Sequence, residues 1–170
     1  MSRESAYPNI ENKNPRSKNK YRILFNKFPN LEYFSNQVTL PSVSGQAIIV
    51  PNQLTDYKVP GEKLEFPTLT VSFQVDEDLR NYEEVLNWMY GIYFPEQHQQ
   101  YADHVKDEDV DCKIVVQMLS NKSNSILNFE FFDAFPTSLS ELDLGEGDSD
   151  YIICTASFEY SYFKINRNVR

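Results

Sequence analysis

The chain has 170 residues and a formal net charge of −9, with 41% hydrophobic and 14% aromatic residues. This length suits one domain with a hydrophobic core, whereas the acidic charge argues against affinity for DNA through release of counterions. No apolar run approaches the length of a membrane span and the N-terminus lacks a signal-peptide pattern, so we expect a soluble protein made in the cytoplasm, without a membrane partner.

The first 20 residues predict an extended N-terminal arm, followed by one β domain over residues 21–170. The arm is polar, contains only two acids, and carries five bases: Arg3, Lys13, Arg16, Lys18 and Lys20. So few apolar residues cannot offset the entropy of ordering. We therefore expect the arm to be mobile alone and to become ordered on an acidic neighbouring subunit. A tail that stays disordered is the alternative.

Three segments of the N-terminal half have strand patterns. Residues 21–28 predict the first strand, and residues 31–40 predict a second after a turn at Pro29 and Asn30. Residues 42–57 form a looser stretch with a short apolar run. Residues 69–75 alternate strictly between apolar and polar side chains, which predicts a half-buried strand.

One amphipathic helix is predicted over residues 78–90, with a stop at Gly91. Acids at residues 76–78 favour its N-terminus. The side chains expected to pack this helix on the core are Leu79, Tyr82, Leu86, Trp88 and Met89.

Strand patterns return after residues 94–111, which predict a long acidic loop. Residues 112–118 and 126–132 form a predicted hairpin around a turn at 120–125, and Pro136 is expected to end the second strand. Residues 152–162 show the longest alternation, which predicts one strand. The predicted fold class is therefore mainly β (α+β).

No residues are expected to be catalytic, to bind a metal or to hold a cofactor. The acids at 76–78 are interpreted as a helix cap. His98 and His104 lack partners at a metal-ligand spacing, and no glycine-rich phosphate-binding motif is present. Cys112 and Cys154 lie in strand patterns, which predicts two buried thiols.

Four aromatic residues raise the question of a platform for single-stranded nucleic acid: Phe129, Phe131, Tyr160 and Tyr162. Such platforms have basic grooves, but the charged neighbours here are acids. We interpret all four as core side chains.

Three segments carry a resemblance to a known family. They are residues 28–44 (FPNLEYFSNQVTLPSVS), residues 59–92 (VPGEKLEFPTLTVSFQVDEDLRNYEEVLNWMYGI), and residues 131–144 (FFDAFPTSLSELDL) followed by SFEYSYF at 157–163. Together they resemble the tail tube superfamily of contractile-tail, T-even-like myophages. Within it, they are most similar to the tail completion or tube terminator (sheath stabiliser) proteins.

The resemblance implies two packed antiparallel sheets flanked by one helix, and a homo-hexameric ring whose inner strands join into one barrel. It implies a structural virion protein that completes the tail tube at its head-proximal end, with tube, sheath or neck proteins as partners. DNA would pass without specific binding, along a neutral or negative channel wall. A tube subunit or a tube-initiating baseplate protein is the alternative within the family. Outside it, the alternatives are a tail-associated hydrolase and a small nucleic-acid-binding β domain.

Overall fold

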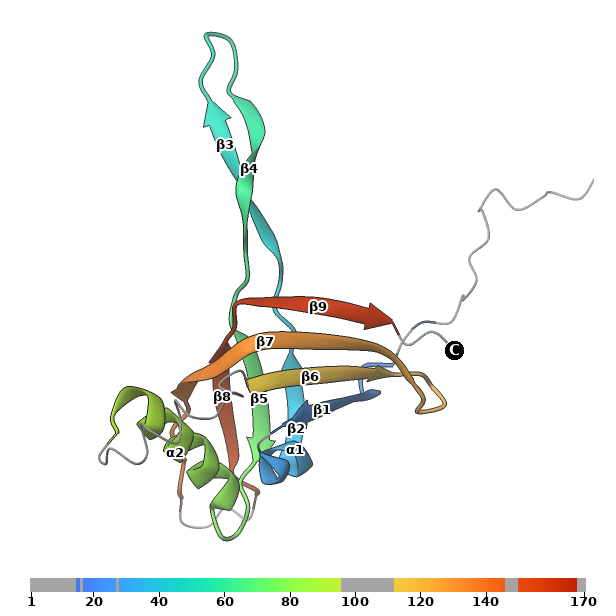
Figure 1. Cartoon of the computed structure of the whole chain (residues 1–170), viewed down its shortest axis with the longest axis vertical. Helices are drawn as coiled ribbons and strands as arrows, with labels where there is room; N and C mark the ends of the chain where they lie inside the picture. Colours follow the sequence, from blue (N-terminus) through green and yellow to red (C-terminus); the bar gives the residue numbers. More distant parts are fainter. Residues whose placement is uncertain (1–14, 16, 27, 96–111, 146–149, 168–170) are drawn as a thin grey trace, which may run out of the picture.

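Two antiparallel sheets that share one long strand enclose the core of this protein (Figure 1). The computed structural model describes residues 15, 17–26, 28–95, 112–145 and 150–167. The elements in chain order are β1 (Tyr21–Phe25), α1 (Pro29–Phe34), β2 (Ser35–Thr39), β3 (Ser44–Val50), β4 (Tyr57–Glu65), β5 (Leu69–Gln74), α2 (Arg80–Tyr93), β6 (Cys112–Leu119), β7 (Ser125–Leu139), β8 (Ile153–Glu159) and β9 (Tyr162–Arg167).

The strands fall into two groups that we name sheet A and sheet B. Sheet A has the order β1-β6-β7-β9, and sheet B has the order β7-β8-β5-β2. Every neighbouring pair in both sheets is antiparallel. The predicted fold, two packed antiparallel sheets with a flanking helix, is therefore confirmed.

Strand β7 belongs to both sheets because it bends at Asp133, which has a left-handed φ of 56°. Its first part pairs with β6 and β9, and residues 135–139 pair with β8. The predicted strand end at Pro136 is wrong: the proline pairs with Phe158, and the register shifts before Ser138. A proline is tolerated here because residues 135–139 form an outer strand of sheet B within the described chain.

The predicted single strand over residues 152–162 is also wrong, since the chain turns beside the bend in β7. Strand β8 ends at Glu159 in sheet B, and β9 begins at Tyr162 in sheet A. Between them, the Ser161 amide donates to the Phe132 carbonyl at 3.1 Å. The buried Tyr160 points into the core, and its hydroxyl donates to the carbonyl of Pro67 at 2.9 Å. Both strands therefore change sheets at one corner.

The core lies between the inward faces of the two sheets. Its buried side chains include Ile23, Ile114 and Phe131 from sheet A, Val71, Phe73 and Phe158 from sheet B, and Leu31 and Val85 from the helices. Cys112 and Cys154 are both buried cysteine thiols, which confirms the prediction.

A short helix, α1, occupies the place of the predicted turn at Pro29 and Asn30, so the following strand starts only at Ser35. Proline at the start of a helix lacks only an amide that would be unpaired anyway, and its fixed φ suits the first turn. Leu31 anchors α1 because it is fully buried.

Helix α2 begins two residues later than predicted and continues past Gly91 to Tyr93. Within the described residues no side chain caps it, so the interpretation of the acids at 76–78 as a helix cap is wrong; instead, the Leu79 backbone amide donates to the Asp76 carbonyl at 2.9 Å in the preceding turn. The buried Asn81 ties α2 to β5: its side-chain amide donates to the Gln74 carbonyl at 2.7 Å, and its side-chain oxygen accepts from the Asp76 amide at 3.2 Å.

The side chains expected to pack α2 lie in different environments. Tyr82 and Trp88 pack against the core, and Trp88 stacks on Phe28 at 4.9 Å between ring centroids. Leu86 and Met89 are half-buried. Leu79 precedes the helix, has a left-handed φ and is 41% exposed.

No helix in the described part of the chain is long and apolar enough to cross a membrane.

Candidate assembly site

A projecting hairpin is the most exposed feature of the fold. Strands β3 and β4 pair with each other and extend far beyond the two sheets (Figure 1). The loosely structured stretch predicted here is therefore wrong. The hairpin exposes six large apolar side chains: Ile48, Ile49, Val50, Leu54, Tyr57 and Leu64. An isolated two-stranded hairpin is marginally stable in water, so this one is suited to packing on another subunit.

The crossing of the two hairpin strands depends on Gly61. A Cβ atom at this position would lie 2.7 Å from the Gln46 carbonyl oxygen, closer than carbon and oxygen approach without bonding. The register shifts between Gly45 and Ala47 at the same level. At the base of the hairpin, the side-chain amide of Gln46 donates to the Glu65 carboxylate at 2.6 Å.

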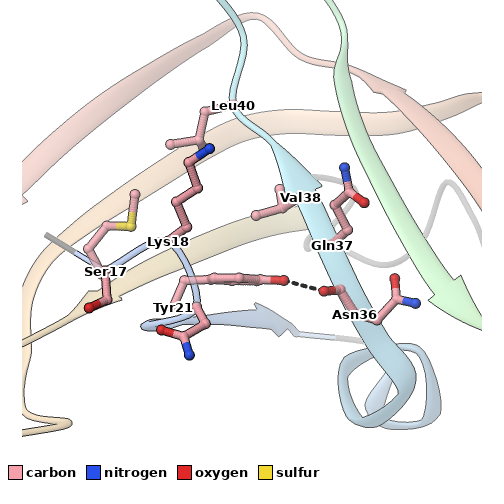
Figure 2. A pocket seen from close by; sticks show the side chains of 9 residues that line it. Ser17, Lys18, Tyr21, Asn36, Gln37, Val38 and Leu40 are labelled. Carbon is pink, nitrogen blue, oxygen red and sulfur yellow. Dashed lines mark hydrogen bonds between the residues drawn. The ribbon is translucent and has the colours of Figure 1, made fainter. Parts of the chain in front are cut away.

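The second feature is a groove of about 610 Å³ between the start of β1 and the outer edge of β2 (Figure 2). Apolar parts of its lining come from Tyr21, Val38, Leu40 and Met118, and Lys18 supplies a positive charge. The Tyr21 hydroxyl donates to the Asn36 carbonyl across the two sheets. Burial raises the pKa of Tyr21. The groove thus opens on the core side of sheet B, at its β2 edge.

Sheet B has two free edges in the part of the chain that the structure describes. Strand β2 pairs only with β5, and residues 135–139 of β7 pair only with β8. Free edges are templates for pairing with another chain. Because sheet B has four antiparallel strands, its two outermost strands run in opposite directions. The β2 edge of one copy and the β7 edge of another can therefore pair antiparallel.

Exposed aromatic side chains gather at the end of α2, next to the β7 edge. Tyr90, Tyr93 and Phe94 are all exposed, Phe94 by 66%. The Tyr93 hydroxyl donates to the Pro136 carbonyl at 3.2 Å, which fixes this end of the helix against β7. The last turn of α2 contains no basic residue.

The outward faces of the two sheets differ in charge. Sheet B presents small hydroxyl side chains, and Ser72 and Thr155 hydrogen-bond to each other at 3.0 Å. Further hydroxyl groups of this face belong to Thr39, Thr70, Ser138 and Ser157. At its margins the described residues add the exposed Phe135 and Ile153 and the charged Glu159. This face is therefore nearly neutral.

Sheet A instead presents a basic and aromatic cluster on its outward face. Phe132 and Tyr162 stack with centroids 4.8 Å apart, and the Lys113 and Lys164 ammonium groups lie 5.2 and 5.5 Å from the Phe132 centroid. Lys113 also pairs with Glu130 at 2.7 Å. Hydrogen bonds from Lys113 and Asn166, with the nearby charge of Lys164, lower the pKa of Glu130.

Sequence reasoning missed this cluster because its lysines come from strands that are distant in sequence. The predicted core positions of Phe129, Phe131 and Tyr160 are confirmed. The predicted core position of Tyr162 is wrong, because its side chain points outward from sheet A and is 39% exposed. The alternation of residues 152–162 does not continue through Tyr162, because the corner at Tyr160 and Ser161 changes which residues face inward.

The predicted arm residues are only partly described. Lys18 lines the groove, and the Lys20 ammonium donates to the Ser123 hydroxyl at 3.2 Å. Arg3, Lys13 and Arg16 lie outside the described residues, as do the acidic loop of residues 96–111 and both histidines. Within the described ranges, no group of three or more His, Cys, Asp or Glu side chains is arranged to hold a metal.

A two-sheet fold with a projecting hairpin, and with strand edges that are free in the described part of the chain, is suited to assembly with further subunits. The sequence pattern of the phage tail tube protein family matches residues 6–166. The chain belongs to this family. It is a structural component of a phage tail, and the resemblance inferred from sequence is confirmed.

A curated relative is the tail tube terminator protein of Enterobacteria phage T4. It is 27% identical over 117 residues, which cover 64% of this chain and 61% of that protein. The chain therefore spans about three-fifths of the length of the curated relative it matches.

Two solved structures share the fold at low sequence identity. A chain of the anti-feeding prophage cap, described as its tube terminating cap, has a TM-score of 0.68 and 13% identity, covering 94% of this chain and 96% of that one. A chain from the sheath/tube terminator of the PVC extracellular contractile injection system has a TM-score of 0.66 and 16% identity, covering 91% and 98%.

Proposed function

We propose that this protein forms a hexameric ring that completes the tail tube of a contractile phage tail at its head-proximal end and leaves a channel for DNA. Membership of the tail tube family and the relation to a tube terminator support this role. The observation that carries it is the pair of free, oppositely directed edges of sheet B. The role needs no catalysis and no cofactor.

Ring closure follows from how these edges can combine. Pairing β2 of one copy with residues 135–139 of the next is a head-to-tail contact, which closes into a ring when the rotation permits. Sheet B then continues through all copies as one barrel without edges. Closure removes the exposed edges that would otherwise lead to aggregation.

The channel wall is assigned to the outward face of sheet B. A wall rich in Lys and Arg would hold DNA through many phosphate contacts. Among the described residues, the hydroxyl-rich face around Ser72 and Thr155 carries no such cation, whereas the sheet A face carries Lys113 and Lys164. The formal net charge is −9 for the whole chain and +3 for the arm, so the net charge of residues 21–170 is −12. This charge suits a channel that DNA passes without binding.

The hairpin is assigned to contacts along the tail axis, with the tube, sheath or neck. It projects away from both sheets, and its apolar side chains are uncovered by the rest of the described chain (Figure 1). Packing on a neighbouring protein would stabilise a conformation that is marginal alone.

Native mass spectrometry of the full chain, together with cryo-electron microscopy of assembled tails, tests this function. We expect a six-copy ring at the head-proximal end of the tube. A chain that is monomeric at high concentration and absent from rings in tails would refute the proposal. A ring at the baseplate end would favour the tube-initiating alternative, and rings repeated along the tail would favour a tube subunit.

A further inference from the structure

We infer that the aromatic end of α2 of one copy fills the groove beside β2 of the next copy. In this contact Tyr90, Tyr93 and Phe94 meet the groove lined by Tyr21, Val38, Leu40 and Met118. The inference rests on the proposed ring and identifies which side chains would join its subunits.

The two surfaces lie on opposite sides of the molecule but on the same face of sheet B. The groove opens on the core side, where Val38 points, and it flanks the free β2 edge. Helix α2 packs on the same core side, because its Val85 belongs to the buried core cluster and its Trp88 packs against that cluster. Its last turn flanks the other free edge through the hydrogen bond from Tyr93 to Pro136. Figure 1 shows the strands β8, β5 and β2 side by side, with α2 lying toward the β8 side and β2 on the other side of β5.

Continuing sheet B from one copy to the next brings these surfaces together. When residues 135–139 pair with β2, everything on the core side of the β7 edge moves over the core side of the β2 edge. The end of α2 then faces the groove. Aromatic side chains are large and become ordered at little cost in entropy, so they suit an apolar groove between subunits.

The charges of the two surfaces are complementary. The C-terminal end of a helix carries a partial negative charge, and the last turn of α2 has no basic side chain of its own. Lys18, at the groove, supplies a positive charge in the position where the helix of the adjoining copy would end (Figure 2). Because Lys18 belongs to the basic N-terminal arm, the arm would take part in the contact between subunits.

Substitutions on the exposed side of the contact test it without disturbing the core. Phe94→Lys is expected to weaken self-association by at least about tenfold, measured by sedimentation across a concentration series, with unchanged circular dichroism. Ile165→Lys, at a comparably exposed apolar residue on β9, is the matched control and should leave association unchanged. Equal association of the Phe94→Lys variant and the parent chain would overturn the inference.

Disulfide trapping between different copies identifies the occupant directly. Phe94→Cys protein mixed with Lys18→Cys protein should form a mixed disulfide under mild oxidation, because the native Cys112 and Cys154 are buried. Leu54→Cys at the hairpin tip, mixed with Lys18→Cys, should not. Trapping of the hairpin, or six-copy rings without the 94–18 bond, would overturn this inference and leave the ring standing. Absence of rings in solution and in tails would overturn both.

Discussion

The hydroxyl of Tyr160 donates a hydrogen bond to the carbonyl of Pro67 at 2.9 Å and joins the corner between the sheets to the segment that leads into β5. Burial, together with the charge of Glu159, raises the pKa of Tyr160 to about 12. The folded state therefore keeps this proton at pH values where the unfolded chain loses it.

We expect the free energy of unfolding to fall between about pH 10 and pH 12, because the unfolded state binds fewer protons than the folded state in this range. This contribution is fully present below about pH 10. Urea unfolding across the range measures the fall. Tyr160→Phe should be less stable at neutral pH and show a shallower decline. Parallel pH profiles for the two proteins would contradict the assignment to Tyr160.

Trp88→Ala should destabilise the subunit by about 2–4 kcal/mol, because the indole stacks on Phe28 and contacts Phe158. Leu86→Ala is the control on the same helix. Leu86 is half-buried outside the core cluster, so its loss should cost about 1 kcal/mol. Denaturant unfolding compares the two variants. A larger effect at Leu86 would mean that α2 packs through a different face.

Gly61→Ala should impair incorporation into tails while leaving the melting temperature of the subunit unchanged. The added methyl group meets the Gln46 carbonyl oxygen at 2.7 Å, so the hairpin must distort. The body should be little affected because, among the described elements, β3 and β4 make their main contacts with each other. Gly45→Ala is the matched control, since its methyl group would make an ordinary contact of 3.8 Å with Leu64. Equal incorporation of both variants would count against a role for the hairpin.

The double substitution Thr70→Lys and Ser157→Lys should slow the passage of DNA without preventing ring formation. Both side chains lie on the outward face of sheet B and are half-buried. Lysines there would bind phosphates through contacts that salt weakens. The rate of DNA release at increasing salt measures the effect, with Gln at both positions as the neutral control. Unchanged release at low salt would show that another face lines the channel.

Deletion of residues 2–20 should give a folded subunit that joins tails poorly, with a defect that grows at high salt. The bases of the arm complement the acidic remainder of the chain. Each exposed ion pair contributes only about 0–1 kcal/mol, but the contacts repeat around a ring. Deletion of residues 2–14 is the comparison, because it keeps Lys18 and Lys20. Infectious tails at normal yield from the longer deletion would exclude an assembly role for the arm.

Patterns of burial made several elements predictable from sequence. The alternation at residues 69–75 and 112–118 placed β5 and β6 within a residue or two, because one face of each strand is buried. Helix α2 was located by its 3.6-residue pattern, and its ends shifted by two or three residues. The family was recognised from ordered segments that cover most of the domain.

Other features left little trace in such patterns. The β3–β4 hairpin is exposed on both faces, so its side chains have no buried side to alternate against. The break at Ser161 is set by the bend at Asp133 in a strand far away in sequence.

By itself, the sequence determined a mainly β, acidic domain, because burial and turn chemistry are local and repeat along the chain, and the resemblance of its ordered segments indicated the tail tube family. Only the tertiary structure decided which surfaces are left open. The groove joins Tyr21 to Val38 and Met118, and the basic cluster joins Lys113 to Lys164. Residues this far apart in sequence become neighbours only when the strands pair and the sheets pack, so no local pattern reveals them.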